Sequence, residues 1–436
     1  MLIKFVCQNI YSINDEIEFR MFKSPTRVLK DHVYNSNNKI KILKSAIMYG
    51  ANAAGKTNFV KAINIGRSFI FGGPNNPNRI DIPTFKLESD ENKNSLFEFT
   101  FLSNGTCYIY GYELNQKSVV KEWCYKLISK KPKLLFERET LKDSTISLTK
   151  GDFAETKKEE NFFAFCQDAT RPTQLFLTTL INNNTKHFGD IISWFKKLTI
   201  IYPESKFGNL FTIIADNNFY QSFIEILNDL GIDIDDFDTK KGSIDDKWLD
   251  VPQNIIDDVK KKITPKSSIH LLSSTGQYLI FSMTDDNKIE VTKLYTQHLN
   301  FNNEKINFEI FEESDGTRRL FDLIPMLLNF KKSDSVFIVD ELDRSFHTNL
   351  SKSIFKLFHK YTNDRPCQLI ATTHDTNLMD LSIFRNDEIW YAKKNSFKST
   401  ELYSLYEFKQ RYDKNLVKDY LNGRFGAVPE INIIEG

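Results

Sequence analysis

One short segment limits the folds open to this chain. Residues 50–57 read Gly-Ala-Asn-Ala-Ala-Gly-Lys-Thr, a complete G-x-x-x-x-G-K-T pattern. An apolar run at 42–49 precedes it, and a helical pattern at 58–63 follows. A Gly- and Ala-rich loop between a strand and a helix turns consecutive backbone N–H groups inward around phosphate oxygens. The chain is therefore expected to fold around a buried strand that ends in a nucleoside triphosphate site.

The residues of this loop have different expected roles. Lys56 reaches the β- and γ-phosphates, and Thr57 offers its hydroxyl to Mg²⁺. The predicted cofactors are ATP and Mg²⁺. The other loop positions predicted to contact the nucleotide are Gly50, Asn52, Ala53, Ala54, Gly55 and Asn58.

Charge and cysteine content exclude several classes of protein. With 58 basic and 57 acidic residues the net charge is +1, so any nucleic-acid contact must be a local patch. The five cysteines are scattered and form no metal-binding pairs, which predicts a reducing compartment and no structural zinc. No run approaches the roughly 18 apolar residues of a membrane span. We expect a cytoplasmic protein without a membrane partner.

Apolar patterns predict three parts. Alternation at 2–7 and 17–21 predicts a hairpin, and the runs between 84 and 137 predict an antiparallel meander, so residues 1–160 form an N-terminal lobe that includes the loop. Helical period then predicts a helical insertion at 161–265. Short strands return afterwards, and residues 266–436 form a C-terminal lobe. The expected class is α/β.

An apolar run at 335–339 ends in Asp340 and Glu341. Such a strand delivers one carboxylate to a magnesium ion and places the next where it can polarise attacking water. Asp340 is therefore a predicted metal ligand beside Thr57, and Glu341 a predicted catalytic residue. An acidic turn after a buried strand is common by itself, but the phosphate loop favours the functional interpretation.

Two more patterns flank this strand. Ser314, Gly316 and Thr317 lie where a helix is predicted to begin, and a hydroxyl with free N–H groups suits an anion there, although Ser314 is equally an ordinary N-cap. Asp343 follows the acidic pair, and the next apolar strand ends in His374. A lone histidine after a strand is more often a surface residue than a catalytic one.

In this order the motifs resemble those of ABC-type ATPases of the RecF/SMC-like branch, and within it the OLD-related stand-alone ATPases of bacterial anti-phage and abortive-infection operons. The resemblance implies an ABC-type P-loop ATPase head with a mixed central sheet, an antiparallel β-subdomain and a helical insertion. It implies catalytic roles for Lys56, Glu341 and His374.

The same resemblance assigns the remaining motifs. Ser314, Gly316 and Thr317 correspond to the signature motif, and Asp343 to the D-loop; both act at the nucleotide of an opposite subunit. Asp315 departs from the glycine of transporters. The Q-loop glutamine has one candidate, Gln174.

The implied assembly is a homodimer, or a higher homo-oligomer, with composite ATP sites. Three functions stay open. The first is a sensor or regulatory ATPase in bacterial anti-phage defence that controls a separately encoded effector, with a nuclease as the expected kind, because the segment after His374 is too short for the nuclease domain that OLD proteins append. The second is a RecF-like DNA-binding repair ATPase, since residues 393–424 carry eight basic and four acidic side chains. The third is a slow ATP-dependent assembly scaffold.

Overall fold

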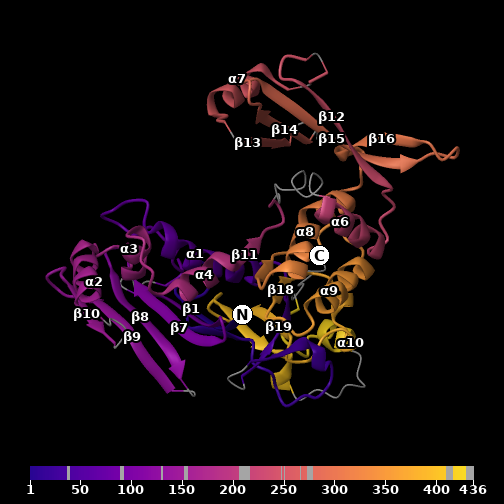
Figure 1. Ribbon diagram of the computed structural model, residues 1–436. Helices are drawn as coiled ribbons and strands as arrows, with labels where there is room; N and C mark the ends of the chain where they lie inside the picture. The colour runs from indigo at the N-terminus through magenta and orange to yellow at the C-terminus, as the bar shows by residue number, and fades with distance from the viewer. Residues whose placement is uncertain are drawn as a thin grey trace, which may run out of the picture. The chain divides into compact units, whose positions relative to one another are not determined.

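The computed structural model divides the chain into two compact units (Figure 1). The first comprises Met1–Pro203, Ser333–Asp343 and Phe355–Gly436, and the second Glu204–Lys332 and Arg344–Ile354. The division at residues 160 and 265 stays a prediction. The structure describes residues 1–36, 40–88, 93–128, 131–151, 156–205, 217–246, 248–249, 251–265, 267–272, 278–408 and 416–428.

A seven-stranded antiparallel sheet dominates the N-terminal part of the first unit. Its order is β10-β9-β8-β7-β6-β1-β2. The predicted hairpin is confirmed, because Phe5 of β1 lies opposite Phe19 of β2. The predicted meander is confirmed as well, and β10 extends it. The strands are β1 (Leu2–Gln8), β2 (Ile17–Arg20), β6 (Ser95–Ser103), β7 (Thr106–Leu114), β8 (Val119–Ile128), β9 (Lys131–Thr140) and β10 (Ile146–Lys150).

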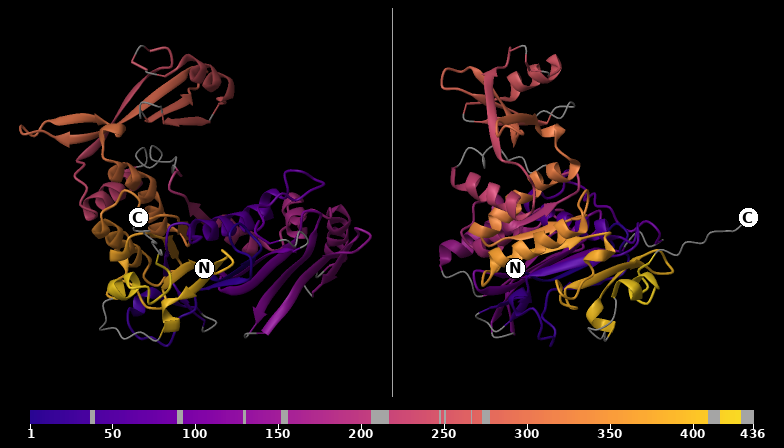
Figure 2. Two further views of the ribbon diagram at one scale, coloured as in Figure 1. Left: turned by 180° about the vertical axis from the view of Figure 1, so that it is seen from behind. Right: turned by 90° about the vertical axis from the view of Figure 1, so that its right-hand side faces the viewer.

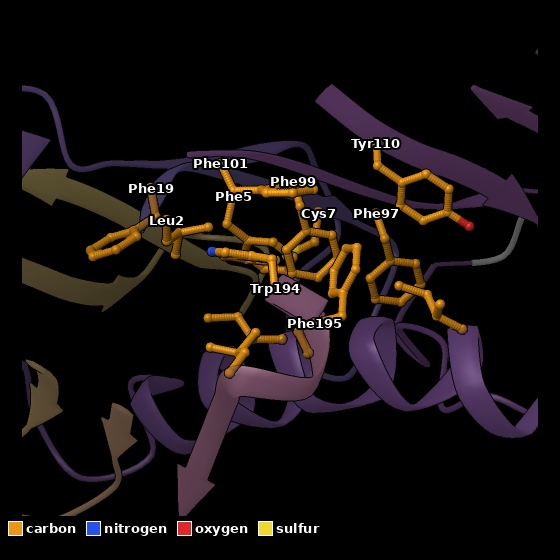
Figure 3. Close-up of a cluster of buried hydrophobic side chains, with 14 of the residues drawn as sticks. Leu2, Phe5, Cys7, Phe19, Phe97, Phe99, Phe101, Tyr110, Trp194 and Phe195 are labelled. Atoms are coloured by element: carbon orange, nitrogen blue, oxygen red, sulfur yellow. The ribbon is translucent and has the colours of Figure 1, made fainter. Parts of the chain in front are cut away.

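Helices α1 (Lys56–Gly72), α2 (Lys157–Ala169), α3 (Phe176–Asn182) and α4 (Gly189–Lys197) lie along one face of this sheet, as both views from front and back show (Figures 1 and 2). Aromatic side chains fill the space between them (Figure 3). Trp194 stacks on Phe101 with ring centroids 4.1 Å apart. Such pairs contribute roughly 0.5–1.5 kcal/mol each beyond the area they bury.

The second sheet carries the phosphate loop. Its order is β11-β17-β18-β5-β19-β20, and every pairing is parallel except β19 with β20. All five residues of β5 are buried, which explains why the strand after Ser45 is continuously apolar rather than alternating. The strands are β5 (Ser45–Tyr49), β11 (Leu198–Ile201), β17 (Val336–Val339), β18 (Gln368–Thr372), β19 (Ile389–Lys394) and β20 (Thr400–Ser404).

The second unit contains a smaller antiparallel sheet in the order β12-β15-β14-β13, with β16 paired to β15. Helix α6 packs on α8, and the ring centroids of Phe223 and Phe321 lie 6.2 Å apart at this contact. The elements are α6 (Asn217–Asp229), β12 (Asp236–Ser243), α7 (Gln253–Lys262), β13 (Ser268–Leu272), β14 (Tyr278–Met283), β15 (Ile289–Leu299), β16 (Lys305–Glu309), α8 (Asp315–Lys332) and α9 (Thr348–Thr362), which the boundary between the units divides.

Residues 161–265 are therefore helical only in part. Strand β11 joins the parallel sheet beside β17, and β12 pairs with β15. Four residues are too few for period to separate a strand from a helical turn, so their partner strand decides the structure. A small hairpin of β3 (Val33–Asn35) and β4 (Lys41–Leu43) and the short helix α10 (Leu416–Leu421) complete the described elements. None of the described helices has the length and apolar character needed to cross a membrane.

Candidate nucleotide-binding site

The phosphate loop connects β5 to α1, and Gly55 is its tightest point. Gly55 has φ 112° and serves as the N-cap of α1, without a capping side chain. A Cβ atom here would lie 2.1 Å from Thr400 Oγ1, so both the backbone angle and the space require glycine. Because no side chain caps α1, its first N–H groups are left to a ligand.

The loop forms one side of a pocket of about 280 Å³. Two residues from the parallel sheet form the other side, one after β17 and one after β18. The lining residues are Asn52, Ala53, Ala54, Gly55, Lys56, Thr57, Asn58, Glu341 and His374. The structure thus gathers the predicted loop residues except Gly50, together with Glu341 and His374, around Lys56, whereas Gly50 offers its carbonyl to the Lys56 ammonium and does not line the pocket.

Lys56 is buried beneath its own loop. Its Nζ donates to Gly50 O at 2.7 Å and Ala51 O at 3.2 Å, and lies 3.4 Å from His374 Nδ1. Burial lowers the Lys56 pKa from 10.5 to about 8, although Asp340 and Glu341 act in the opposite direction. The ammonium group therefore sits in a site that anionic oxygens would stabilise.

Asp340 directly follows β17, and one of its carboxylate oxygens has a hydrogen-bond donor while the other has none among the described residues. Oδ1 accepts from Thr372 Oγ1 at 2.6 Å, whereas Oδ2 is buried with no hydrogen-bond partner among the described residues. A buried carboxylate oxygen without a donor is costly unless a cation neutralises it. Oxygen ligands suit Mg²⁺, so Asp340 with the Thr57 hydroxyl fits the predicted magnesium site.

Glu341 and His374 face each other across the pocket. Glu341 has φ 49°, an unusual backbone angle for a non-glycine residue, and its N–H donates to Thr372 Oγ1 at 2.8 Å. The Glu341 Oε1 to His374 Nε2 distance is 3.8 Å. Burial and the Lys56 charge lower the His374 pKa, which favours a neutral ring. Since an ammonium only donates, Nδ1 facing Lys56 is the acceptor and Nε2 carries the proton.

Asp343 holds the backbone beneath His374. Its carboxylate accepts from the His374 N–H, at 3.2 Å for Oδ2. The predicted D-loop aspartate thus fixes the position of the predicted switch histidine within the same subunit. The resemblance also implies that Asp343 acts at the nucleotide of an opposite subunit, and this contact within one subunit does not test that role.

The second unit contains Ser314, Gly316 and Thr317, and their contacts are described within that unit alone. Ser314 is exposed and caps α8, accepting from Thr317 N at 3.1 Å, so the N-cap interpretation is confirmed. A Cβ atom on Gly316 would lie 2.8 Å from Ser345 O, which requires glycine where α8 meets the segment after Asp343.

Sequence reasoning missed the residues that support the site. Thr372 bonds both Asp340 and Glu341, and its signal was its place at the end of the strand that precedes His374. Thr400 Oγ1 donates to Ala54 O at 2.9 Å, bracing the loop from β20. Ala427 O accepts from Ala51 N at 3.0 Å, so the C-terminal segment also holds the loop. The contacts of Thr400 and Ala427 join residues more than 340 positions apart, so no local sequence pattern predicts them.

The structure also describes the Q-loop candidate Gln174 and part of the basic stretch 393–424. Gln174 is buried among polar contacts with Arg138 and Arg171 and is not one of the residues that line the pocket. In the basic stretch 393–424, residues 409–415 lie outside the described residues. Of the others, Lys393 pairs with Glu401 at 3.3 Å and Arg424 with Asp419 at 2.7 Å.

This chain is similar to known proteins in sequence and in structure. A family model described as "AAA domain, putative AbiEii toxin, Type IV TA system" matches residues 45–380, more than half of the chain. No curated protein matches this chain significantly. Among 111 matching chains of solved structures is the SMC head domain from Thermotoga maritima, 11% identical with a TM-score of 0.40 over 92% of this chain and 98% of that one.

Two more solved structures have similar statistics. An Smc head bound to the C-winged helix domain of ScpA is 13% identical, with a TM-score of 0.39 over 92% of this chain and 97% of that one. An Smc head with an extended coiled coil, bound to the C-terminal domain of ScpA from Pyrococcus furiosus, is 12% identical, with a TM-score of 0.36 over 94% and 99%. The family match over 45–380 establishes that this chain belongs to the AAA-domain family described as putative AbiEii toxins of type IV toxin–antitoxin systems, and with its phosphate loop between β5 and α1 it is a P-loop ATPase.

Proposed function

We propose that this chain is an ATP-driven switch, which pairs with a second copy around two ATP molecules and controls a separately encoded effector in bacterial anti-phage defence. The observation that carries the ATPase part is the convergence of Lys56, Glu341 and His374 on one pocket beside the orphaned oxygen of Asp340. The pocket contains a cation for phosphate, a carboxylate for water and a neutral imidazole.

Each residue has one task in hydrolysis. Lys56 leaves its carbonyl partners for the β- and γ-phosphates. Thr57 and Asp340 are the residues that would hold Mg²⁺, and a bound Mg²⁺ would offset charge on the phosphate oxygens. Glu341 orients and polarises the attacking water, and the Nε2–H of His374 contacts the γ-phosphate. Catalysis of this kind rests on positioned charge rather than covalent chemistry.

Pairing would complete the site. Ser314 is exposed at the first turn of an 18-residue helix, where the hydroxyl and the N–H groups suit a phosphate from outside the subunit. In the proposed dimer, or higher homo-oligomer, the loop of one copy faces Ser314, Gly316 and Thr317 of the other. ATP then favours the closed assembly, and hydrolysis releases it.

Complementation between two inactive variants tests the composite site. Lys56→Ala and Ser314→Arg should each abolish ATPase activity alone. A mixture forms heterodimers with one intact site, made from Lys56 of one copy and Ser314 of the other, so part of the activity should return. Activity that stays at background in the mixture, although both variants bind each other, contradicts the composite site.

The Glu341→Gln variant tests the switch. It keeps the shape of the side chain and removes the charge that activates water, so ATP should hold the closed dimer. Light scattering after gel filtration with ATP should show a dimer for Glu341→Gln, and for Lys56→Ala the same mass as without ATP. The exposed Glu407→Gln is the matched control and should behave as the parent. A Glu341→Gln variant as active and as monomeric as the parent contradicts the mechanism.

The effector part rests on the family description, which names a type IV toxin–antitoxin system. A tagged Glu341→Gln chain expressed with its neighbouring genes should co-purify one of their products in an ATP-dependent manner, and loss of that gene should abolish protection from phage. Protection by this chain alone contradicts the proposal. Salt-sensitive DNA binding without a protein partner would instead support the RecF-like alternative, and ATP-dependent assembly without turnover the scaffold.

A further inference from the structure

A buried polar cluster lies at the opposite end of β5 from the phosphate loop. It contains His32 at the end of a short 3-10 helix, Ser45 at the start of β5, His359 in α9 and Glu388 just before β19. All four side chains are buried, and Ser45 and Glu388 are completely enclosed. The nucleotide site uses none of them.

The four side chains converge on one another. Glu388 accepts from Ser45 Oγ at 2.7 Å and lies 2.9 Å from His32 Nδ1. Ser45 Oγ lies 3.0 Å from His359 Nε2. One ligand atom each from His32, His359 and Glu388 lies within 4.8 Å of the other two.

Two observations show capacity left over in this cluster. His359 Nδ1 is buried and has no hydrogen-bond partner among the described residues, although buried ring nitrogens are normally paired. Burial, and then the neighbouring His32, hold the His359 pKa well below its usual value. A neutral imidazole is the form that binds metals.

An opening connects the cluster to solvent. A pocket of about 430 Å³ is lined by both histidines, with Leu29, Asp31 and Asn363 at its wall. The ammonium of Lys44 is held at the wall of this pocket by two backbone carbonyls, donating to Asp31 O at 3.1 Å and Asn363 O at 2.7 Å. An ion can therefore reach the two rings without unfolding the lobe.

We propose that His32, His359 and Glu388 bind one first-row divalent transition-metal ion, Zn²⁺ in the first instance, which fastens the segment before β3 and helix α9 to the segment before β19. Two imidazoles and one carboxylate are a recognised ligand set for such ions, with water from the pocket as the fourth ligand. Mg²⁺ is disfavoured, since it prefers oxygen ligands.

The geometry requires a small rearrangement. Ligand atoms around tetrahedral zinc lie roughly 3.4 Å apart at bonds of 2.0–2.1 Å, so the cluster must contract by about 1 Å. The two rings are stacked at 3.4 Å with planes 11° apart, so they must tilt to aim both nitrogens at one ion. Ser45 Oγ would remain as a donor to Glu388, which orients the carboxylate.

Nothing in the sequence announced this ligand set. The scattered cysteines predicted that the chain has no structural zinc, and the proposed site uses none of them. Its ligands come from positions 32, 359 and 388, so they form no local motif.

Metal content and stability test the proposal together. The full chain, stripped with a chelator and dialysed against Zn²⁺ without nucleotide, should retain one zinc per chain by elemental analysis. At a zinc concentration about 100-fold above Kd, its melting temperature should rise by roughly 5 °C. His32→Asn and Glu388→Gln should each lose the bound zinc and the shift, and an equal concentration of Mg²⁺ should not displace zinc from the parent chain.

The matched control is His298→Asn. His298 also lies near a carboxylate, 2.7 Å from Glu313 Oε1, but outside the cluster. This variant should bind zinc as the parent does. Should the cluster variants fail to fold, Co²⁺ in the parent chain replaces them, and tetrahedral d–d absorption lost on adding Zn²⁺ supports the site. A parent chain that retains no zinc, or cluster variants that retain it fully, overturns the proposal, and the four residues are then a hydrogen-bonded network only.

Discussion

The two ends of β5 are built from similar residue types in opposite states. At the carboxyl end, Asp340 has a buried oxygen without a partner and Glu341 holds a strained backbone angle. At the amino end, Glu388 receives hydrogen bonds from Ser45 and from the Arg385 N–H, and His32 lies beside it. Both carboxylates are buried, yet only one is satisfied by the protein.

This difference separates binding from folding. A satisfied buried carboxylate contributes to stability, whereas an unsatisfied one costs stability that a ligand repays. Parallel strands direct both kinds to fixed places, because loops at their carboxyl ends form the crevice that takes the ligand. Substitutions at the two ends should therefore act on different measurements.

The largest effect is expected for Glu388→Ala at the amino end. It leaves Ser45, His32 and the Arg385 N–H without their acceptor in the core, so the free energy of unfolding should fall by about 3–5 kcal/mol. Chemical denaturation of the metal-free chain measures it. Glu401→Ala removes an exposed carboxylate paired with Lys393 and should cost less than about 1 kcal/mol. Equal losses for both variants would remove the contrast between the ends.

Asp340→Asn at the carboxyl end should show the reverse pattern. ATPase activity should fall by roughly 10²- to 10³-fold, because the metal-facing charge is lost. Stability without nucleotide should stay level or rise, since one oxygen of the buried carboxylate has no hydrogen-bond partner among the described residues. Steady-state turnover and a denaturation curve of the same preparation measure both. A variant that is both active and destabilised would show that Asp340 is structural.

Thr372→Val sharpens the comparison with a smaller change. The substitution keeps the shape but removes the hydroxyl that donates to Asp340 and accepts from the Glu341 N–H. Losing these hydrogen bonds should raise the activation free energy by about 1–3 kcal/mol, so kcat should fall by roughly ten- to a hundredfold. Thr373→Val, one residue on, removes only an acceptor for Asp375 N and should change kcat less. The reverse ranking would count against Thr372 as the support of the acidic pair.

The smallest effect concerns pH. Lys56 has a pKa near 8 instead of 10.5 in the folded chain, so between these values the folded state binds fewer protons than the unfolded state. Its contribution to stability therefore rises with pH over this range, while phosphate binding, which needs the ammonium, weakens. ATP affinity should drop roughly tenfold between pH 7 and pH 9.

A titration with a fluorescent ATP analogue measures this dependence. Lys56→Arg, which stays charged throughout, should bind with an affinity that is flat over the same range. An affinity of the parent that is also flat would mean that Lys56 keeps an ordinary pKa.

Several features were predictable because their causes are local. The spacing of residues 50–57 predicted a loop between a strand and a helix, and the structure has β5 and α1 there. Alternation predicted the hairpin of β1 and β2. In contrast, β11 was hidden within helical surroundings, since its only reason to extend is the neighbouring β17. In the second unit β12 likewise pairs with a distant strand, Asp236 lying opposite Gln297 of β15, whereas β13 to β16 pair with the strands next to them in the sequence.

The sequence by itself determined the chemistry at the carboxyl end of β5: a phosphate loop, an acidic pair and a histidine, each at the end of an apolar strand, because strand order and loop spacing are written in consecutive residues. Only the tertiary structure decided which groups support that chemistry and which lie opposite it. Thr372, Thr400 and Ala427 reach the loop or the acidic pair from distant strands and turns, and His32, His359 and Glu388 meet only after the sheet has formed. These contacts share one physical reason, because most buried polar groups must be paired with another group, and the tertiary fold decides which residues can provide it.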